Sequence, residues 1–68
     1  MISEEEKKLI HLLVDLGAEN DLINSICSNM TDIQLTYVRL YLLRLQEKKD
    51  IITTSDMLMA KVVAINRV

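Results

Sequence analysis

Proline is absent from this chain, and glycine occurs only once, at Gly17. These two residues form most of the tight turns that join β-strands and most irregular loops. A chain with so few of them is left with helices joined by short connections. We therefore expect an all-α fold in which three to four helices form a small bundle around a central long third helix. Residues 1–68 are expected to form a single helical domain.

The chain has few ways to stabilise so small a fold by cross-links. Its 68 residues include one cysteine and one histidine, which exclude an internal disulfide and make a four-ligand zinc site improbable, so no cofactor is expected. Half of the residues are hydrophobic and the mean hydropathy is +0.19, although 26% of the residues are charged. This surplus of apolar side chains suggests that a partner chain adds to the stability of the fold.

The first helix has the clearest start and end signals. Ser3 and Glu6 have the spacing of a capping box, in which each side chain satisfies a free backbone amide at the helix start. Apolar residues then fill one broad face, and Gly17 can adopt the left-handed conformation that ends a helix. The pattern predicts a helix over residues 4–16.

The second helix is predicted at residues 20–29, with Asn20 or Asp21 as its N-terminal cap. Its apolar face has regular spacing, but several of its residues are poor helix formers, so packing must hold it together. A second capping box, Thr31 with Gln34, opens the helix that follows.

The third helix, predicted at residues 32–49, is apolar around almost its whole circumference. A helix of this kind is normally buried. One stripe on it, formed by Leu35, Val38, Leu42 and Leu45, has the 3-4-3 spacing of knobs-into-holes packing. Two interpretations remain open, because this stripe is either a self-association seam or the side that packs against the chain's own helices.

The C-terminal segment resembles the third helix in its apolar content. Thr53 and Asp56 form a third possible capping box, which predicts a helix over residues 54–66. The β-branched residues within 62–65 leave a strand as the alternative. Over the whole chain the expected core is Leu9, Leu12, Leu13, Leu16, Ile23, Ile26, Leu35, Val38, Leu42, Leu45, Ile51 and Leu58.

No group of residues in the sequence has the pattern of a catalytic site. His11 falls on the polar side of the first helix, where a solvated histidine is the common case. Cys27 falls on an apolar face, where a free cysteine usually acts as a small hydrophobic residue. Phosphate-binding loops, CxxC and HExxH motifs are all missing from the sequence. The protein is therefore expected not to be an enzyme and not to bind a small-molecule substrate.

The sequence instead favours a non-catalytic protein–protein interaction module that self-associates, with another protein as the alternative partner. A homodimer is the expected assembly. The predicted partner-binding residues are the stripe on the third helix and two methionines that suit an adaptable surface: Leu35, Val38, Leu42, Leu45, Met57 and Met59. No apolar run is long enough for a membrane span, and the acidic N-terminal residues with a lone thiol favour the cytoplasm.

A second hypothesis comes from another class of protein. Helix two, the connection of residues 28–31 and helix three resemble a helix-turn-helix over about a third of the chain, with Asn29 at the turn position where glycine is usual. The resemblance implies a small DNA-binding regulator. Asp32 would stand at the exposed start of the recognition helix, and the chain carries a net charge of −2, so nucleic acid is disfavoured as a partner.

Overall fold

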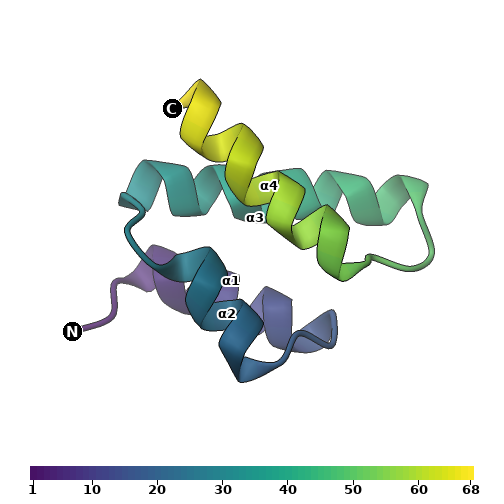
Figure 1. The fold of residues 1–68 in the computed structure, drawn as a ribbon, viewed down its shortest axis with the longest axis horizontal. Coiled ribbons are helices and arrows are strands. Elements are labelled where there is room, and N and C mark those ends of the chain that lie inside the picture. The colour runs from purple at the N-terminus through teal and green to yellow at the C-terminus, as the bar shows by residue number, and fades with distance from the viewer.

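The computed structural model describes all 68 residues and contains four helices and no strand. Figure 1 shows α1 (Glu4–Asp15), α2 (Asn20–Cys27), α3 (Asp32–Lys48) and α4 (Thr54–Arg67). The predicted all-α fold is confirmed, and each predicted helix boundary lies within two residues of the observed one. The C-terminal segment is a helix, so the strand alternative is wrong.

Two of the three predicted capping boxes are complete. At the start of α3, the Thr31 hydroxyl oxygen accepts from the Gln34 amide at 3.1 Å, and the Gln34 side chain accepts from the Thr31 amide at 2.9 Å. At the start of α4, Thr53 and Asp56 make the same reciprocal pair of bonds at 3.1 and 2.9 Å. Both helices therefore begin at a residue that the sequence specifies.

The starts of α1 and α2 differ from the expectation. Ser3 accepts from the Glu6 amide at 3.2 Å, but the return bond from the Glu6 side chain is not formed. Glu19, rather than Asn20 or Asp21, is the N-cap of α2, and its side chain makes no capping bond. The packing of α2 against its neighbours thus substitutes for a capping bond, as its weak helix formers require.

Two residues with left-handed backbone conformation mark the connections between the first three helices. Gly17 has a φ of +88° directly after α1, as predicted. Asn29 has a φ of +58° in the connection between α2 and α3. Asparagine tolerates this conformation better than other side-chain-bearing residues, which explains how the chain turns there without a second glycine.

The four helices pack around one apolar core. In Figure 1, α4 crosses α3, and α1 and α2 lie together on the other side of the bundle. The central helix α3 packs against α1 and α4, while α2 packs against α1 and α4. The long third helix is therefore the centre of the bundle, and its remaining side faces solvent.

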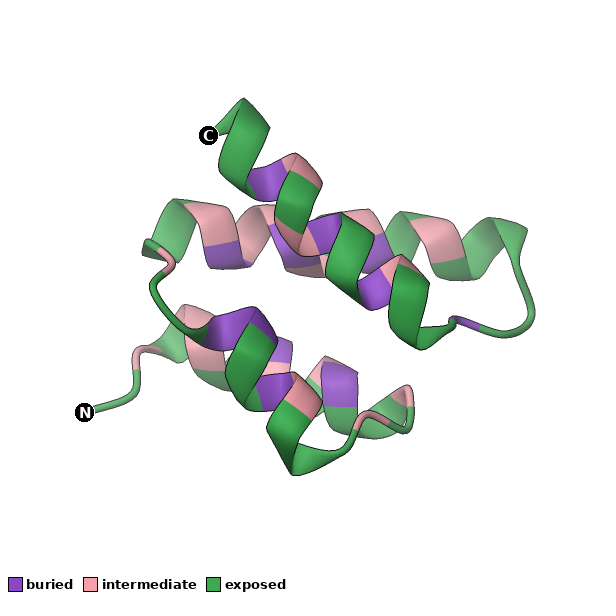
Figure 2. Cartoon of the chain, viewed as in Figure 1, coloured by how far each residue is buried: buried purple, intermediate pink, exposed green.

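The core consists of twelve buried hydrophobic residues, and Figure 2 shows them gathered where the helices face one another. They are Leu9, Leu13, Ile23, Ile26, Cys27, Leu35, Val38, Leu42, Ile52, Met57, Ala60 and Ala64. Leu12, Leu16 and Leu45 are partly buried against this core. Every expected core residue in the first three helices is thus buried or partly buried.

Two predicted core residues are wrong, and both lie in the C-terminal third of the chain. Ile51 is 74% exposed and Leu58 is 42% exposed, whereas their neighbours Ile52 and Met57 are buried. Apolar residues follow one another in both places, so the spacing did not indicate which one points inward. The buried Ala60 and Ala64 lie on the same side of α4 as Met57, so the inner face of this helix is the one with the smallest side chains.

The exposed surface of the chain is 4694 Å². A closed globular protein of its 7.8 kDa mass exposes about 4,400 Å². The two values are close, so the helices enclose their core without help from another chain. A partner would add to the outside of this bundle rather than complete an open core.

Candidate interaction surface

The predicted partner-binding residues lie mainly inside the bundle. Leu35, Val38, Leu42 and Met57 are buried, Leu45 is partly buried against the core, and Met59 is 51% exposed. The stripe on α3 therefore packs against the chain's own helices, which was the second of its two interpretations. Of the six residues, only Met59 is largely exposed in this closed bundle.

The opposite side of α3 is also apolar, and it faces solvent. Ile33, Leu40 and Leu43 are 67%, 50% and 38% exposed, and Tyr37 and Tyr41 are half-buried beside them. A shallow groove runs along this side and is lined by Tyr37, Leu40, Tyr41, Leu43, Arg44 and Glu47. The all-round apolar pattern of α3 thus has two separate origins, a core side and an exposed groove.

The outer side of α4 carries a second exposed apolar stripe. Leu58, Val62 and Ile65 follow one another at i, i+4 and i+7 and are 42%, 50% and 49% exposed. Met59 lies beside them and is 51% exposed. Residues with this spacing share one face of a helix, so α4 presents a continuous apolar stripe about two turns long.

Lys61, the only charged residue within this stretch of α4, makes its contacts with α2 instead. Its ammonium group donates to the backbone carbonyl of Ser25 and, at 3.1 Å, to that of Ser28. These carbonyls belong to the C-terminal end of α2, where the helix dipole favours a cation. The contact binds α4 to α2 and leaves the outer stripe of α4 without a charge.

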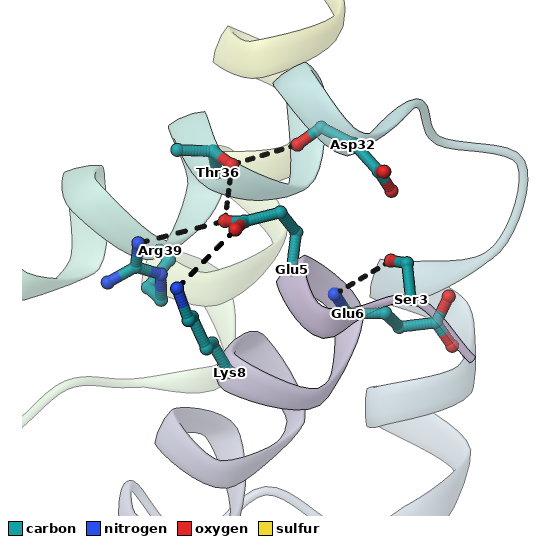
Figure 3. Close-up of polar contacts among 7 residues, drawn as sticks. All are labelled: Ser3, Glu5, Glu6, Lys8, Asp32, Thr36 and Arg39. Atoms are coloured by element: carbon teal, nitrogen blue, oxygen red, sulfur yellow. Dashed lines mark hydrogen bonds and ion pairs between the residues drawn. The ribbon is translucent and has the colours of Figure 1, made fainter.

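A polar cluster joins α1 to α3 and is shown in Figure 3. The Thr36 hydroxyl donates to the Glu5 carboxylate at 2.6 Å, and it lies 2.9 Å from the Asp32 carbonyl oxygen. The guanidinium of Arg39 and the ammonium of Lys8 lie 3.8 and 3.5 Å from the same carboxylate. Carboxylate and cations are thus already matched within the chain, which suits a structural role.

The electrostatics of this cluster follow from its contacts. The Thr36 hydrogen bond lowers the pKa of Glu5, and the charges of Lys8 and Arg39 lower it further against an opposing effect of desolvation. Glu5 is therefore held as a carboxylate. The Nε of Arg39 is buried without a hydrogen-bond partner, and its guanidinium faces Glu5. Arg39 is consequently occupied by α1 and is poorly placed to contact a phosphate.

The two residues with the most reactive side chains, His11 and Cys27, lie in different surroundings. His11 is exposed on α1, and Cys27 is buried in the core. Burial raises the pKa of the Cys27 thiol to about 11, and the nearby charge of Glu6 adds to the shift. The thiol is therefore protonated at neutral pH and acts as a small hydrophobic residue, as predicted.

Neither a metal cluster nor a spanning helix is present in the described structure, which covers the whole sequence given. No three side chains among His, Cys, Asp and Glu come together in a way that could hold a metal ion. None of the four helices combines the length and the apolar character needed to cross a lipid bilayer.

Comparison with protein-family models, with curated proteins and with solved structures finds no match to this chain. Its own surface is therefore the guide to its function. The most distinctive features of that surface are the groove on α3 and the stripe on α4.

Sequence reasoning singled out only Met59 among the exposed residues of these two faces. It selected the α3 stripe for its 3-4-3 spacing, whereas Ile33, Leu40 and Leu43 on the opposite side are separated by seven and three positions. On α4 a usable signal was present, because Ala60 and Ala64 are the smallest apolar residues of the helix and mark its closely packed side. The stripe of Leu58, Val62 and Ile65 lies away from that side.

Proposed function

We propose that this protein is a non-catalytic interaction module that self-associates through the outer sides of α3 and α4. One observation carries the proposal: these two helices expose large apolar side chains on faces that the core does not use. Such residues at single positions are ordinary on a protein surface, whereas faces formed by several of them mark sites of interaction.

The area that an interface requires supports the participation of both helices. A stable interface removes about 800 Å² from each partner, roughly a sixth of the 4694 Å² that the chain exposes. The stripe on α4 is only two turns long and is too narrow to supply this area. Because α3 and α4 pack against each other, a partner that covers the outside of one can extend over the other.

A second copy of the chain is the simplest partner. Closed two-fold assemblies are the commonest among soluble oligomers, because each chain contributes the same patch. We also propose that the protein acts in the cytoplasm, since its only cysteine is a buried thiol and structural thiols persist in reducing compartments.

Light scattering over a wide range of protein concentration tests the proposal. We expect the wild-type chain to form a dimer and the variants Leu40→Glu and Val62→Glu to remain folded monomers by circular dichroism. Val14→Glu is the matched control, since Val14 is 56% exposed on α1, outside both faces. A wild-type chain that stays monomeric at every concentration would exclude self-association.

A helix-turn-helix regulator is the second candidate function. The observation in its favour is Asn29, whose left-handed conformation lies in the four-residue connection between α2 and α3. The exposed side of α3 opposes it, because Asp32 stands in the first turn and Leu40 lies at the centre. Salt-sensitive binding to mixed duplex DNA at low ionic strength would support this candidate, and an absence of binding would reject it.

A further inference from the structure

We propose that the groove on α3 lies at the two-fold axis of the dimer, where Arg44 of each chain pairs with Glu47 of the other chain. The inference rests on the proposed function, because it names the partner and the contacts of the same surface. The pairing adds specific charges to an interface otherwise formed by apolar side chains.

The groove combines apolar, aromatic and charged side chains. Leu40 and Leu43 provide exposed apolar surface, and Tyr37 and Tyr41 add aromatic rings with polar ends. Tyrosine is enriched at protein interfaces because it offers a large contact area at a small entropic cost. The remaining lining residues are one cation and one anion, Arg44 and Glu47, which are one helical turn apart.

Neither of these two charges has a partner within the chain. The four ion pairs of the structure use the cations of Lys7, Lys8, Arg39 and Lys49. Arg44 and Glu47 take part in none of them, although a three-residue separation would allow them to pair with each other. Both charges are therefore free to be matched from outside.

The charges of the groove select a second copy as its occupant. A fitting surface must offer an anion to Arg44 and a cation to Glu47 beside an apolar centre. Two-fold rotation brings the same patch face to face, so that residue i contacts residue j and residue j contacts residue i. One rotation thus matches both charges at once and brings the Leu40 side chains near the axis. A partner of a single charge sign would leave one of the two charges facing a like charge.

Charge exchange between the two positions tests the pairing. In a dimer of Arg44→Glu, positions 44 and 47 of both chains are negative. In a dimer of Glu47→Arg, the same four positions are positive. We expect each single variant to dimerise at least ~10-fold more weakly than the wild type by analytical ultracentrifugation. The double variant Arg44→Glu/Glu47→Arg restores opposite charges, and we expect a dissociation constant within ~3-fold of the wild-type value.

A mixture of the two single variants provides the sharper test. Each chain alone presents charges of one sign, so an equimolar mixture should form a heterodimer at least as tight as the wild-type dimer. The control is Arg67→Glu, which changes the net charge by the same amount at the end of α4 and should leave the dimer intact. Circular dichroism confirms that all the variants remain helical.

The possible failures of the two proposals are distinguishable. If the wild-type chain dimerises and Val62→Glu prevents it, but the charge variants dimerise normally, self-association stands and the Arg44–Glu47 pairing is wrong. A mixture of single variants that does not associate would also overturn the pairing. A wild-type chain that never dimerises would overturn both proposals.

Discussion

The outer sides of α1 and α4 differ in composition although both helices contribute to the same core. On α1 the exposed residues include Glu4, Lys7, Lys8, His11 and Asp15, so its outer side is mainly charged. On α4 the corresponding side carries Leu58, Val62 and Ile65. Each helix buries only two or three residues, so the core does not require the additional apolar residues of α4.

This difference separates two uses of apolar residues. The residues that fold the chain are those that meet between helices, and on α1 these are the buried Leu9 and Leu13, with Leu12 partly buried beside them. The residues on the outside of α4 keep about half of their surface in water in the single chain. Water exposure of such side chains is unfavourable, which supports the proposed interaction.

The largest difference in the free energy of unfolding is expected between substitutions on the inner and on the outer side of α4. Met57 is 3% exposed and Val62 is 50% exposed. We expect Met57→Ala to lower the free energy of unfolding by about 2–5 kcal/mol, because it leaves a cavity in the core. Val62→Ser should change it by less than about 0.5 kcal/mol in the monomer. Urea denaturation at a low protein concentration measures both values, and equal losses would show that Val62 belongs to the folding core.

The sequence predicts the helices of this protein better than it predicts their faces. Helix starts depend on local hydrogen bonds, and the pairs Thr31–Gln34 and Thr53–Asp56 form as their spacing indicates. Gly17 ends α1 for an equally local reason, because glycine adopts a positive φ without strain. These features depend on residues a few positions apart, so sequence alone is enough to locate them.

The candidate surface was harder to predict because it depends on contacts between distant parts of the chain. Leu42 and Leu40 are only two residues apart, and yet one is fully buried and the other is half exposed. Both have similar apolar neighbours at helical spacing, so periodicity ranks them equally. The choice depends on where α1 and α4 pack on α3. The inward contact of Lys61 is likewise a tertiary feature, since its acceptors lie more than thirty residues away.

A smaller effect is expected at Lys61, whose contact with α2 leaves the outer side of α4 without a charge. Lys61→Met keeps an unbranched side chain that is one atom shorter and removes the bonds to the end of α2. We expect a loss of about 1 kcal/mol in the free energy of unfolding, because the carbonyls of Ser25 and Ser28 lose a charged donor at a helix C-terminus. Lys61→Arg keeps the charge and should recover part of this loss. Thermal and urea denaturation of both variants measure the difference, and an unchanged Lys61→Met variant would show that the contact does not stabilise the fold.

The smallest expected effect concerns the two carboxylates that hold the outer helices to α3. Glu5 binds α1 to Thr36, and Asp56 accepts from the ammonium of Lys49 at 2.7 Å where α3 leads into α4. The Thr36 hydrogen bond lowers the pKa of Glu5, and the Lys49 hydrogen bond lowers the pKa of Asp56. Each group is thus a stronger acid in the folded chain than in the unfolded chain, where their pKa values are near 4.5 and 3.8.

The sign of the pH dependence follows from these shifts. The stabilisation by both carboxylates is fully present above their unfolded pKa values and is lost as the pH falls through the lower folded values. We therefore expect the wild-type chain to lose stability below about pH 4.5, whereas Glu5→Gln and Asp56→Asn should each be less stable at pH 7 and lose less on acidification. Urea denaturation at pH 7, 5, 4 and 3 measures the slopes. If Glu5→Gln flattens the slope and Asp56→Asn does not, the link between α1 and α3 is the stronger of the two. Identical slopes in all three proteins would mean that neither carboxylate contributes to holding the outer helices.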